Sequence, residues 1–159
     1  MEIRLAENGD LSGWVRLVEP MRHLFPGLET PESMEGYARD IAGAISRQEA
    51  LCAVENGTIC GVLAFSRAEN ELAFLAVSAQ HRRQGIARKL AERMFRELDP
   101  SRPVKLITYR ARVPEGEAAR SLYQRLGFCP GRLVEVDGSP AQEFLRPAEI
   151  PGSERSEAE

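Results

Sequence analysis

The sequence lacks the long apolar run that a membrane-spanning helix requires. No stretch of the 159 residues approaches the ~20 consecutive apolar side chains needed to cross a bilayer. The segment MEIRLAENGD at the start of the sequence has neither the apolar centre nor the small-residue cleavage site of a signal peptide. We therefore expect a cytoplasmic protein without a membrane partner.

Cysteine and histidine are also scarce. The chain has three cysteines (Cys52, Cys60 and Cys129) and two histidines (His23 and His81). The cysteines form no CxxC pair and no Cys/His spacing typical of a zinc site, so we expect no bound metal. Because Cys52 and Cys60 fall in strand-like apolar runs, we predict buried, reduced thiols there.

A large excess of positive charge is missing as well. The net charge is −3, with 43% hydrophobic and 28% charged residues, as in ordinary globular proteins. This balance argues against a nucleic-acid or membrane-surface partner, and it makes the basic stretch HRRQGIARKL a local feature suited to a small anion. The sequence has neither the GK[ST] ending of a P-loop nor a GxGxxG dinucleotide fingerprint.

The first half of the chain alternates strand and helix patterns. A short strand is predicted over 2–6, followed by a helix that Asp10 caps. Thr30 before Pro31 predicts the start of a second helix, whose apolar face runs over 34–45. Asn-Gly then joins two strand-like runs, ALCAVEN and TICGVLAFSR, which predicts a hairpin because both turn residues tolerate a positive φ.

The second half continues with strands and two further helices. Residues 71–77 are nearly all apolar and predict a strand buried on both faces. A helix is expected from Ile86, a strand over 104–109, and a helix from Pro114 that Gly127 closes in a left-handed conformation. FCPGRLVEV and AQEFLR predict a final antiparallel pair.

The resulting order, β-α-α-β-β-β-α-β-α-β-β, predicts an α/β (α+β) fold. We expect one central mixed, mostly antiparallel sheet of about seven strands with about four flanking helices. Since the chain has no internal repeat and no linker-like segment, we predict a single domain over 1–147. The polar residues 148–159 predict a flexible tail.

The glycine in HRRQGIARKL marks a candidate anion site. The first N–H groups of a helix lack partners within the helix and attract phosphates. Gly85 and Ala87 are small enough to let a pyrophosphate approach, and Arg82, Arg83 and Arg88 add positive charge. On this string alone, a solvated basic helix face with an incidental glycine remains the alternative.

Two motifs together resemble the GNAT superfamily of acetyl-CoA-dependent N-acetyltransferases. LAVSAQHRRQGIARKLAERM is similar to its acetyl-CoA-binding motif, a strand ending in valine followed by R/Q-x-x-G-x-G/A at the start of a helix. ARSLYQRLGF is similar to the motif A-x-x-L-Y-x-x-x-G-F. Their separation by one helix and one strand, together with the element order, extends the resemblance over residues 2–146.

The resemblance implies acetyl-CoA as co-substrate and a primary amine of a small molecule or peptide as acceptor. The pantetheine arm would pair with the backbone of Leu75, Ala76 and Val77. The pyrophosphate would lie on a second set, which consists of Arg82, Arg83, Gln84, Gly85, Ile86, Ala87 and Arg88. A homodimer is compatible with the family, many of whose members dimerise.

The resemblance also implies two catalytic residues. Tyr123 matches the position that often protonates the CoA thiolate, although its place on an apolar helix face equally suits a packed core tyrosine. Glu71 matches a strand position where some lysine-acetylating relatives carry a base that acts through water; the alternative is an exposed glutamate at a strand end. Glu115 and Glu117 are weaker candidate bases, since a glutamate at a helix N-terminus commonly serves the helix dipole.

One position departs from the family pattern. Many members have an asparagine seven residues before the motif tyrosine, whereas this chain has Gly116. The departure weakens any assignment to the ribosomal-protein N-terminal acetyltransferases and keeps open a catalytically inactive acyl-CoA-binding module for sensing or interaction. In the family, the region after the first helix walls the acceptor cleft, where His23, Phe25 and Tyr37 either line the cleft or pack in the core.

Overall fold

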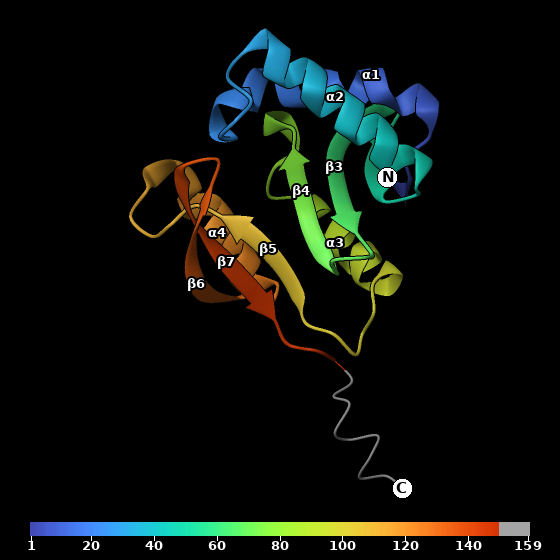
Figure 1. Cartoon of the computed structure of the whole chain (residues 1–159). Coiled ribbons are helices and arrows are strands. Elements are labelled where there is room, and N and C mark those ends of the chain that lie inside the picture. The colour runs from blue at the N-terminus through green and yellow to red at the C-terminus, as the bar shows by residue number, and fades with distance from the viewer. Residues whose placement is uncertain (150–159) are drawn as a thin grey trace, which may run out of the picture. The chain divides into compact units, whose positions relative to one another are not determined.

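The computed structural model describes residues 1–149, which form two compact units (Figure 1). The first unit comprises Met1–Phe65 and Ala73–Met94, and the second comprises Ser66–Leu72 and the residues from Phe95 onward. The elements are β1 (Glu2–Leu5), α1 (Leu11–Val18), α2 (Pro31–Ser46), β2 (Ala50–Glu55), β3 (Thr58–Ser66), β4 (Glu71–Val77), α3 (Ile86–Glu97), β5 (Val104–Thr108), α4 (Glu117–Arg125), β6 (Cys129–Val136) and β7 (Ser139–Arg146).

This order confirms the predicted succession of strands and helices. The strands hydrogen-bond in the order β1-β2-β3-β4-β5-β7-β6 as one seven-stranded mixed sheet. The β2–β3 hairpin turns at Asn56 and Gly57, whose φ angles of 51° and 75° confirm the predicted turn. Short 3-10 helices at Asn8–Asp10, Glu19–Leu24, Ala79–His81 and Pro114–Gly116 supplement these elements.

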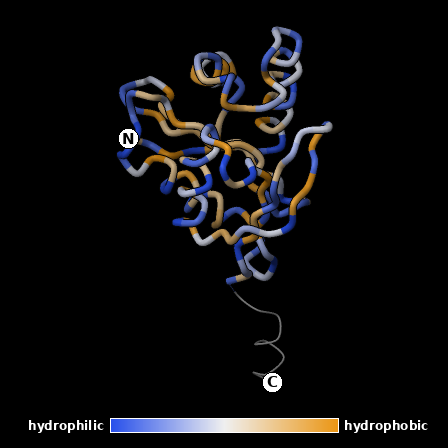
Figure 2. The backbone as a smooth tube through the Cα atoms, turned by 90° about the vertical axis from the view of Figure 1, so that its left-hand side faces the viewer, coloured by the Kyte–Doolittle hydropathy of each residue, from blue (hydrophilic) through white to orange (hydrophobic). Residues whose placement is uncertain are grey.

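In the first unit, the helices α1 and α2 lie side by side (Figure 1). Their apolar faces bury Trp14, Val18 and Ile41 in a cluster that includes Cys52 and Val62 of β2 and β3. Along the backbone, hydrophobic stretches alternate with hydrophilic ones (Figure 2). Cys52 and Cys60 are buried free thiols, as predicted.

In the second unit, the helix α4 covers one face of β5, β7 and β6 (Figure 1). Both β5 and β6 pair with β7 in antiparallel register, and Phe144 of β7 is fully buried opposite Leu106 of β5. The parallel register between β4 and β5 consists of one pair, Glu71 opposite Lys105.

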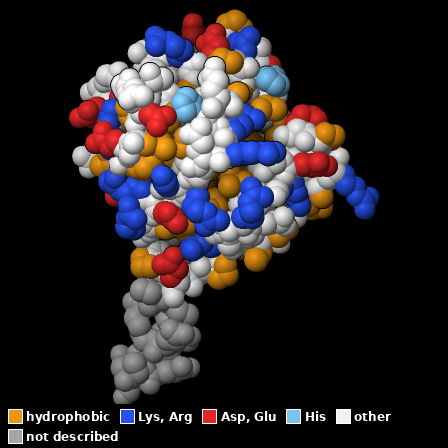
Figure 3. All heavy atoms as spheres, turned by 180° about the vertical axis from the view of Figure 1, so that it is seen from behind, with side chains coloured by type: hydrophobic (Ala, Val, Ile, Leu, Met, Phe, Trp, Pro, Cys, Tyr) orange, Lys and Arg blue, Asp and Glu red, His pale blue; other side chains and the backbone are white. Residues whose placement is uncertain are grey.

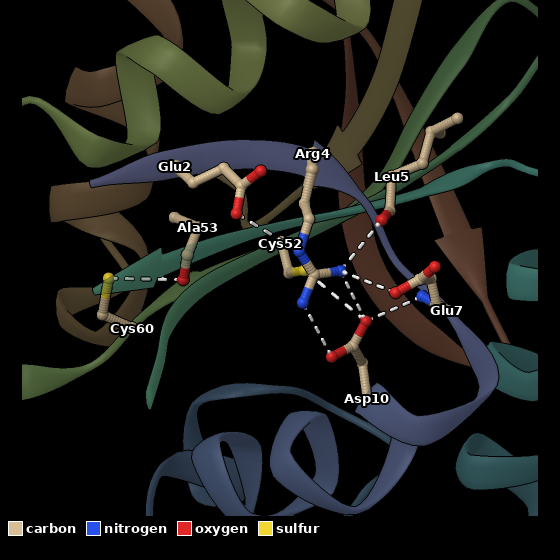
Figure 4. Close-up of polar contacts among 8 residues, drawn as sticks. All are labelled: Glu2, Arg4, Leu5, Glu7, Asp10, Cys52, Ala53 and Cys60. Carbon is tan, nitrogen blue, oxygen red and sulfur yellow. Dashed lines mark hydrogen bonds and ion pairs between the residues drawn. The ribbon is translucent and has the colours of Figure 1, made fainter. Parts of the chain in front are cut away.

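Asp10 does not cap α1 with its side chain, contrary to the prediction. Its backbone is already helical (φ −86°, ψ −10°), whereas a capping residue is normally extended. The carboxylate instead accepts hydrogen bonds from Glu7 N–H at 2.7 Å and from both terminal nitrogens of Arg4 at 2.7 and 3.1 Å (Figure 4). These bonds hold the pKa of Asp10 below its usual value, and the hydrogen bond with Arg4 has the largest effect.

The strand β4 is less buried than its apolar sequence predicts. Leu72, Leu75 and Ala76 are buried, but Ala73 is exposed and Phe74 is half-buried. The apolar run therefore does not mark a strand covered on both faces along its whole length.

Three further features concern only the part of the chain that the structure describes. Among residues 1–149, no helix is both long and apolar enough to cross a membrane. The same residues contain no group of three or more His, Cys, Asp or Glu side chains able to hold a metal ion. Of the predicted tail, residues 150–159 lie outside the described range.

Candidate functional site

The turn before α3 carries the predicted anion-binding residues in the first unit. The first helical hydrogen bond of α3 runs from Lys89 N–H to the Gly85 carbonyl, at 3.0 Å. The N–H groups of the three residues between them therefore precede the helical bonding pattern and are available to a ligand. Apart from Gly85 and its two chain neighbours, no described residue has an atom within 4 Å of a Cβ built on Gly85, so the approach to this turn is open.

The backbone conformation supplies a second reason for glycine at this position. Gly85 has a φ of +76°, in the left-handed region that disfavours side chains. Arg83, two residues earlier, also has a positive φ of 64°. Turns of this kind orient successive N–H groups toward an anion. The sequence analysis recognised only the need for a small side chain and missed the left-handed conformation.

The side chains of the turn divide into exposed and buried groups. Arg82, Arg83, Gln84 and Arg88 are exposed. On the face of the molecule seen from behind, Lys and Arg side chains are interspersed with Asp, Glu and hydrophobic ones (Figure 3). Ile86 is instead buried, so only its backbone faces the anion side. A Cβ on Gly61 of β3 would lie 2.7 Å from the Ile86 side chain, and this close approach fixes the first turn of α3 against the strand.

The three predicted pantetheine-binding residues form the end of β4. Leu75 and Ala76 are buried and Val77 is half-buried. Just before them, the Phe74 ring packs against Phe25 at 4.5 Å and Tyr37 at 5.0 Å between centroids.

Two of the residues considered for the acceptor cleft are therefore packed in the first unit. The Tyr37 hydroxyl also accepts a hydrogen bond from Trp14 Nε1 at 2.8 Å, and burial raises the pKa of Tyr37. Phe25 and Tyr37 thus follow the packing alternative, whereas His23 is exposed.

Tyr123 lies in the last turns of α4 in the second unit, where the chain leaves the helix. Phe128 N–H bonds to the Tyr123 carbonyl at 3.0 Å and Gly127 N–H bonds to the Gln124 carbonyl at 3.1 Å. With Gly127 at a φ of +96°, these bonds form a Schellman motif, which confirms the predicted closing glycine. The Tyr123 ring packs edge-on against Phe128 and Phe144.

The Tyr123 hydroxyl keeps its proton despite this packing. The side chain is half-buried. Burial raises the pKa of Tyr123 to about 12, so the phenol stays protonated at neutral pH. The packing role and the proton-donor role are thus compatible for this one residue.

Glu71 begins β4 in the second unit and is half-buried rather than fully exposed. Burial raises the pKa of its carboxyl group; Lys105 opposes this effect, whereas the nearby carboxylates Glu69 and Glu143 add to it. Glu115 and Glu117 are exposed, and Glu117 lies in the first turn of α4. Within residues 1–149, no hydrogen bond joins Tyr123 and Glu71.

Asn70, to which no sequence pattern assigned a role, anchors the start of β4. It is 1% exposed, and its side-chain amide donates to the carbonyls of Asp99, Arg102 and Pro103. Its Oδ1 accepts from Asp99 N–H at 2.9 Å. These bonds fix the position of Asn70, and with it the start of Glu71, through partners about thirty positions away that no local pattern indicates.

At position 116, where many family members have asparagine, the Tyr109 side chain occupies the space that a larger residue would need. Gly116 is buried, and a Cβ there would overlap the Tyr109 side chain. Arg120 of α4 donates to the Tyr109 carbonyl at 2.8 Å and to Gln142 Oε1 at 2.7 Å. No side chain fits at 116 unless Tyr109 moves, and the sequence alone gives no signal for this contact.

Comparison with known proteins places these features in context. A family model described as an acetyltransferase (GNAT) domain matches residues 46–130. The sequence matches no curated protein.

Solved structures give similar folds at low identity. An acetyltransferase of the GNAT family from Bacillus cereus ATCC 10987 is 20% identical with a TM-score of 0.71, over 92% of this chain and 96% of that one. The PaiA N-acetyltransferase from Thermoplasma acidophilum, solved in complex with coenzyme A, is 21% identical with a TM-score of 0.67, over 92% and 98%. An N-acetyltransferase from Staphylococcus aureus Mu50 is 16% identical with a TM-score of 0.73, over 91% and 100%.

Proposed function

Because the chain belongs to the GNAT acetyltransferase family, we propose that it transfers the acetyl group of acetyl-CoA directly to a primary amine of a small molecule or peptide. The observation that carries the proposal is the open left-handed turn at Gly85, with unpaired N–H groups at the start of α3 and exposed arginines beside it. The proposal includes a cytoplasmic location and residues 1–147 as one domain.

In this proposal the first unit binds the co-substrate. The N–H groups and arginines of residues 82–88 hold the pyrophosphate. The backbone of residues 75–77 pairs with the amides of the pantetheine arm. The register pair of β4 with β5 is at Glu71, four residues before this segment. Binding then holds the thioester for attack, which turns a bimolecular encounter into an oriented reaction.

Tyr123 and Glu71 carry the proton transfers in this proposal. The neutral amine nitrogen attacks the thioester carbonyl carbon, and the tetrahedral intermediate collapses to the amide with departure of the CoA sulfur. Tyr123 donates its phenolic proton to that sulfur, and Glu71 accepts a proton from the amine through a water molecule. A phenol that stays protonated at neutral pH and a carboxyl group with a raised pKa support these two roles.

The alternative function is acyl-CoA binding without catalysis, as a sensing or interaction module. Two observations favour it: the packing against Phe128 accounts for an aromatic ring at position 123 without chemistry, and Gly116 replaces the family asparagine. The two functions share the anion-binding turn and differ in whether the thioester is consumed.

Two measurements test the proposal in sequence. Calorimetric titration with acetyl-CoA and with CoA should give saturable binding, and its absence would reject both functions. Thiol release from acetyl-CoA is then followed with polyamines, amino acids, aminoglycosides and peptides as acceptors. Acceptor-dependent release supports the transferase, whereas binding without release across this panel supports the inactive module.

Sedimentation of the same samples decides between monomer and homodimer.

A further inference from the structure

One arginine connects the middle of α4 to the strands of the second unit. Arg120 Nη1 donates to the carbonyl of Tyr109, directly after β5, at 2.8 Å and to Gln142 Oε1 of β7 at 2.7 Å. Gln142 Nε2 in turn donates to the Gly131 carbonyl of β6 at 2.8 Å. A terminal guanidinium nitrogen carries two N–H groups, so both bonds of Arg120 can form at once. The helix is therefore joined through one side chain to three strands or strand ends.

The same side chain contacts the ring on which Tyr123 packs. The Arg120 Cζ atom lies 4.9 Å from the centroid of the Phe144 ring, within the range of a cation–π contact. The Tyr123 ring meets the Phe144 ring edge-on, with centroids 6.4 Å apart. Residues three positions apart lie on one face of a helix, which explains how both side chains reach this ring. Arg120 and Tyr123 thus share a fully buried partner.

The helix α4 depends on such contacts because it has little core of its own. Among its nine residues, all of them described, none is buried. At its start, a Cβ on Gly116 would overlap the Tyr109 side chain, and at its end the left-handed Gly127 reverses the chain. Between these ends, the two hydrogen bonds of Arg120 resist rotation of the helix about its axis. Such a rotation would displace the Tyr123 hydroxyl, because its side chain lies on the same face of the helix.

We propose that Arg120 is a positioning residue for Tyr123, which holds the phenolic hydroxyl where it can donate its proton to the departing CoA sulfur. The motif A-x-x-L-Y-x-x-x-G-F leaves position 120 unspecified, so the family resemblance assigns this arginine no role. A displacement of about 1 Å can lower a rate ~100-fold, so a residue that touches no substrate can affect turnover. The inference rests on the proposed function, because it requires Tyr123 to act as the general acid.

The test is a double-mutant cycle on thiol release from acetyl-CoA. Arg120→Met keeps an unbranched side chain that suits a helix and removes the donors. Release is measured at saturating acetyl-CoA, with whichever amine of the panel above gives the fastest release. We expect Arg120→Met to slow release about tenfold in the wild type but less than about twofold in Tyr123→Phe, because an absent hydroxyl cannot be displaced. Affinity for acetyl-CoA should stay at the wild-type value, since the proposed binding residues belong to the first unit.

Two further arginine variants separate positioning from a general loss of stability. Arg125 lies on the same helix, but its Nη1 donates to Ser121 Oγ of that helix at 2.7 Å. Arg125→Met should therefore leave the rate of release unchanged in both backgrounds. Arg120→Lys keeps a charged donor without the planar guanidinium, so its rate should lie between those of Arg120→Met and the wild type.

Two substitutions of Gln142 carry the test if Arg120→Met does not fold. Gln142→Glu keeps an oxygen that accepts from Arg120 and loses the donor to Gly131, whereas Gln142→Met loses both. We expect Gln142→Met to slow release about threefold when Tyr123 is present, and Gln142→Glu to release thiol at the wild-type rate. Equal rates in the two variants would count against the connection between Arg120 and Gln142 as the cause.

The possible outcomes separate the inference from the proposed function. An unchanged rate in Arg120→Met, an equal fall with and without the Tyr123 hydroxyl, or an equal fall in Arg125→Met would overturn the inference alone. If Tyr123→Phe itself releases thiol at the wild-type rate, both the general acid and its positioning residue are lost, while acetyl transfer stands. No acceptor-dependent release by the wild type would overturn the proposed function and the inference together.

Discussion

The ring of Tyr123 meets the ring of Phe128 edge-on, with centroids 6.1 Å apart, across the turn that ends α4. Gly127 makes this contact possible, because its left-handed backbone reverses the chain between the two aromatic residues. The contact explains the spacing of tyrosine, glycine and phenylalanine in ARSLYQRLGF as the end of a helix. A test of catalysis must therefore keep the ring and remove only the hydroxyl.

Tyr123→Phe makes that change. If the phenol protonates the departing thiolate, turnover should fall about 100-fold, within the usual range for loss of a general acid. Affinity for acetyl-CoA and the free energy of unfolding should stay close to wild-type values, because the ring contacts remain. Steady-state kinetics, calorimetry and urea unfolding check the three expectations. Unchanged turnover would remove Tyr123 from the mechanism.

Gly127→Ala tests the helix end. The left-handed conformation costs a side chain about 1–2 kcal/mol, and the new Cβ would lie 3.2 Å from Arg146 Nε, which has to shift. Gly127→Asn is the matched control, since asparagine tolerates this conformation better than alanine. Urea unfolding should rank wild type above Asn and Asn above Ala; equal loss in both variants would show that the backbone conformation is not the cause.

Gly85→Asp and Gly85→Asn form a pair that separates charge from conformation. Both residues tolerate a positive φ, both enter open space, and they have nearly the same shape. We expect similar stability but about tenfold weaker CoA binding for Asp than for Asn, because a carboxylate repels the pyrophosphate at close range. Equal affinities would mean that the phosphates bind elsewhere.

Asn70→Gly tests the anchor at the start of β4. Glycine keeps the left-handed backbone of Asn70 (φ 50°) and removes the amide that bonds three carbonyls and one N–H. Leaving buried backbone groups without partners should lower the free energy of unfolding by about 2–3 kcal/mol. Asn70→Ala should lose about 1 kcal/mol more, from backbone strain. A loss within experimental error for Asn70→Gly would contradict the anchoring role.

Asp10→Asn tests the pH dependence of the Arg4 ion pair. The pKa of Asp10 is lowered in the folded protein, so its stabilisation is complete above the ordinary carboxyl pKa of about 3.9 and is lost as the pH falls through the folded value. We expect the variant to be less stable by about 1–2 kcal/mol at neutral pH. In strong acid the two proteins should converge, which unfolding curves across the pH range would reveal.

Local patterns in the sequence predicted most of the fold. The Asn56-Gly57 turn, the Thr30 cap and the left-handed Gly127 depend on residues within a few positions, and each was confirmed. Asp10 was misjudged because its carboxylate bonds Arg4 of a neighbouring strand rather than the helix that follows.

In the candidate site, too, the features that depend on neighbouring residues were predicted, and those that depend on distant residues were not. The turn at Gly85 is local, so its position at the start of α3 could be predicted from the sequence. The anchor at Asn70 and the packing of Tyr109 on Gly116 join residues that only the folded chain brings together. No periodicity or motif marks such contacts, because they depend on where the second unit places its loops.

The shared contact of Tyr123 and Phe128 has an evolutionary consequence. Selection for a stable helix end favours an aromatic ring at position 123 together with Gly127 and Phe128, but it does not distinguish tyrosine from phenylalanine. A lineage that lost catalysis and kept only ligand binding would therefore be free to replace the tyrosine by phenylalanine. In proteins with this helix end, the hydroxyl rather than the ring is the part of the motif that can report activity.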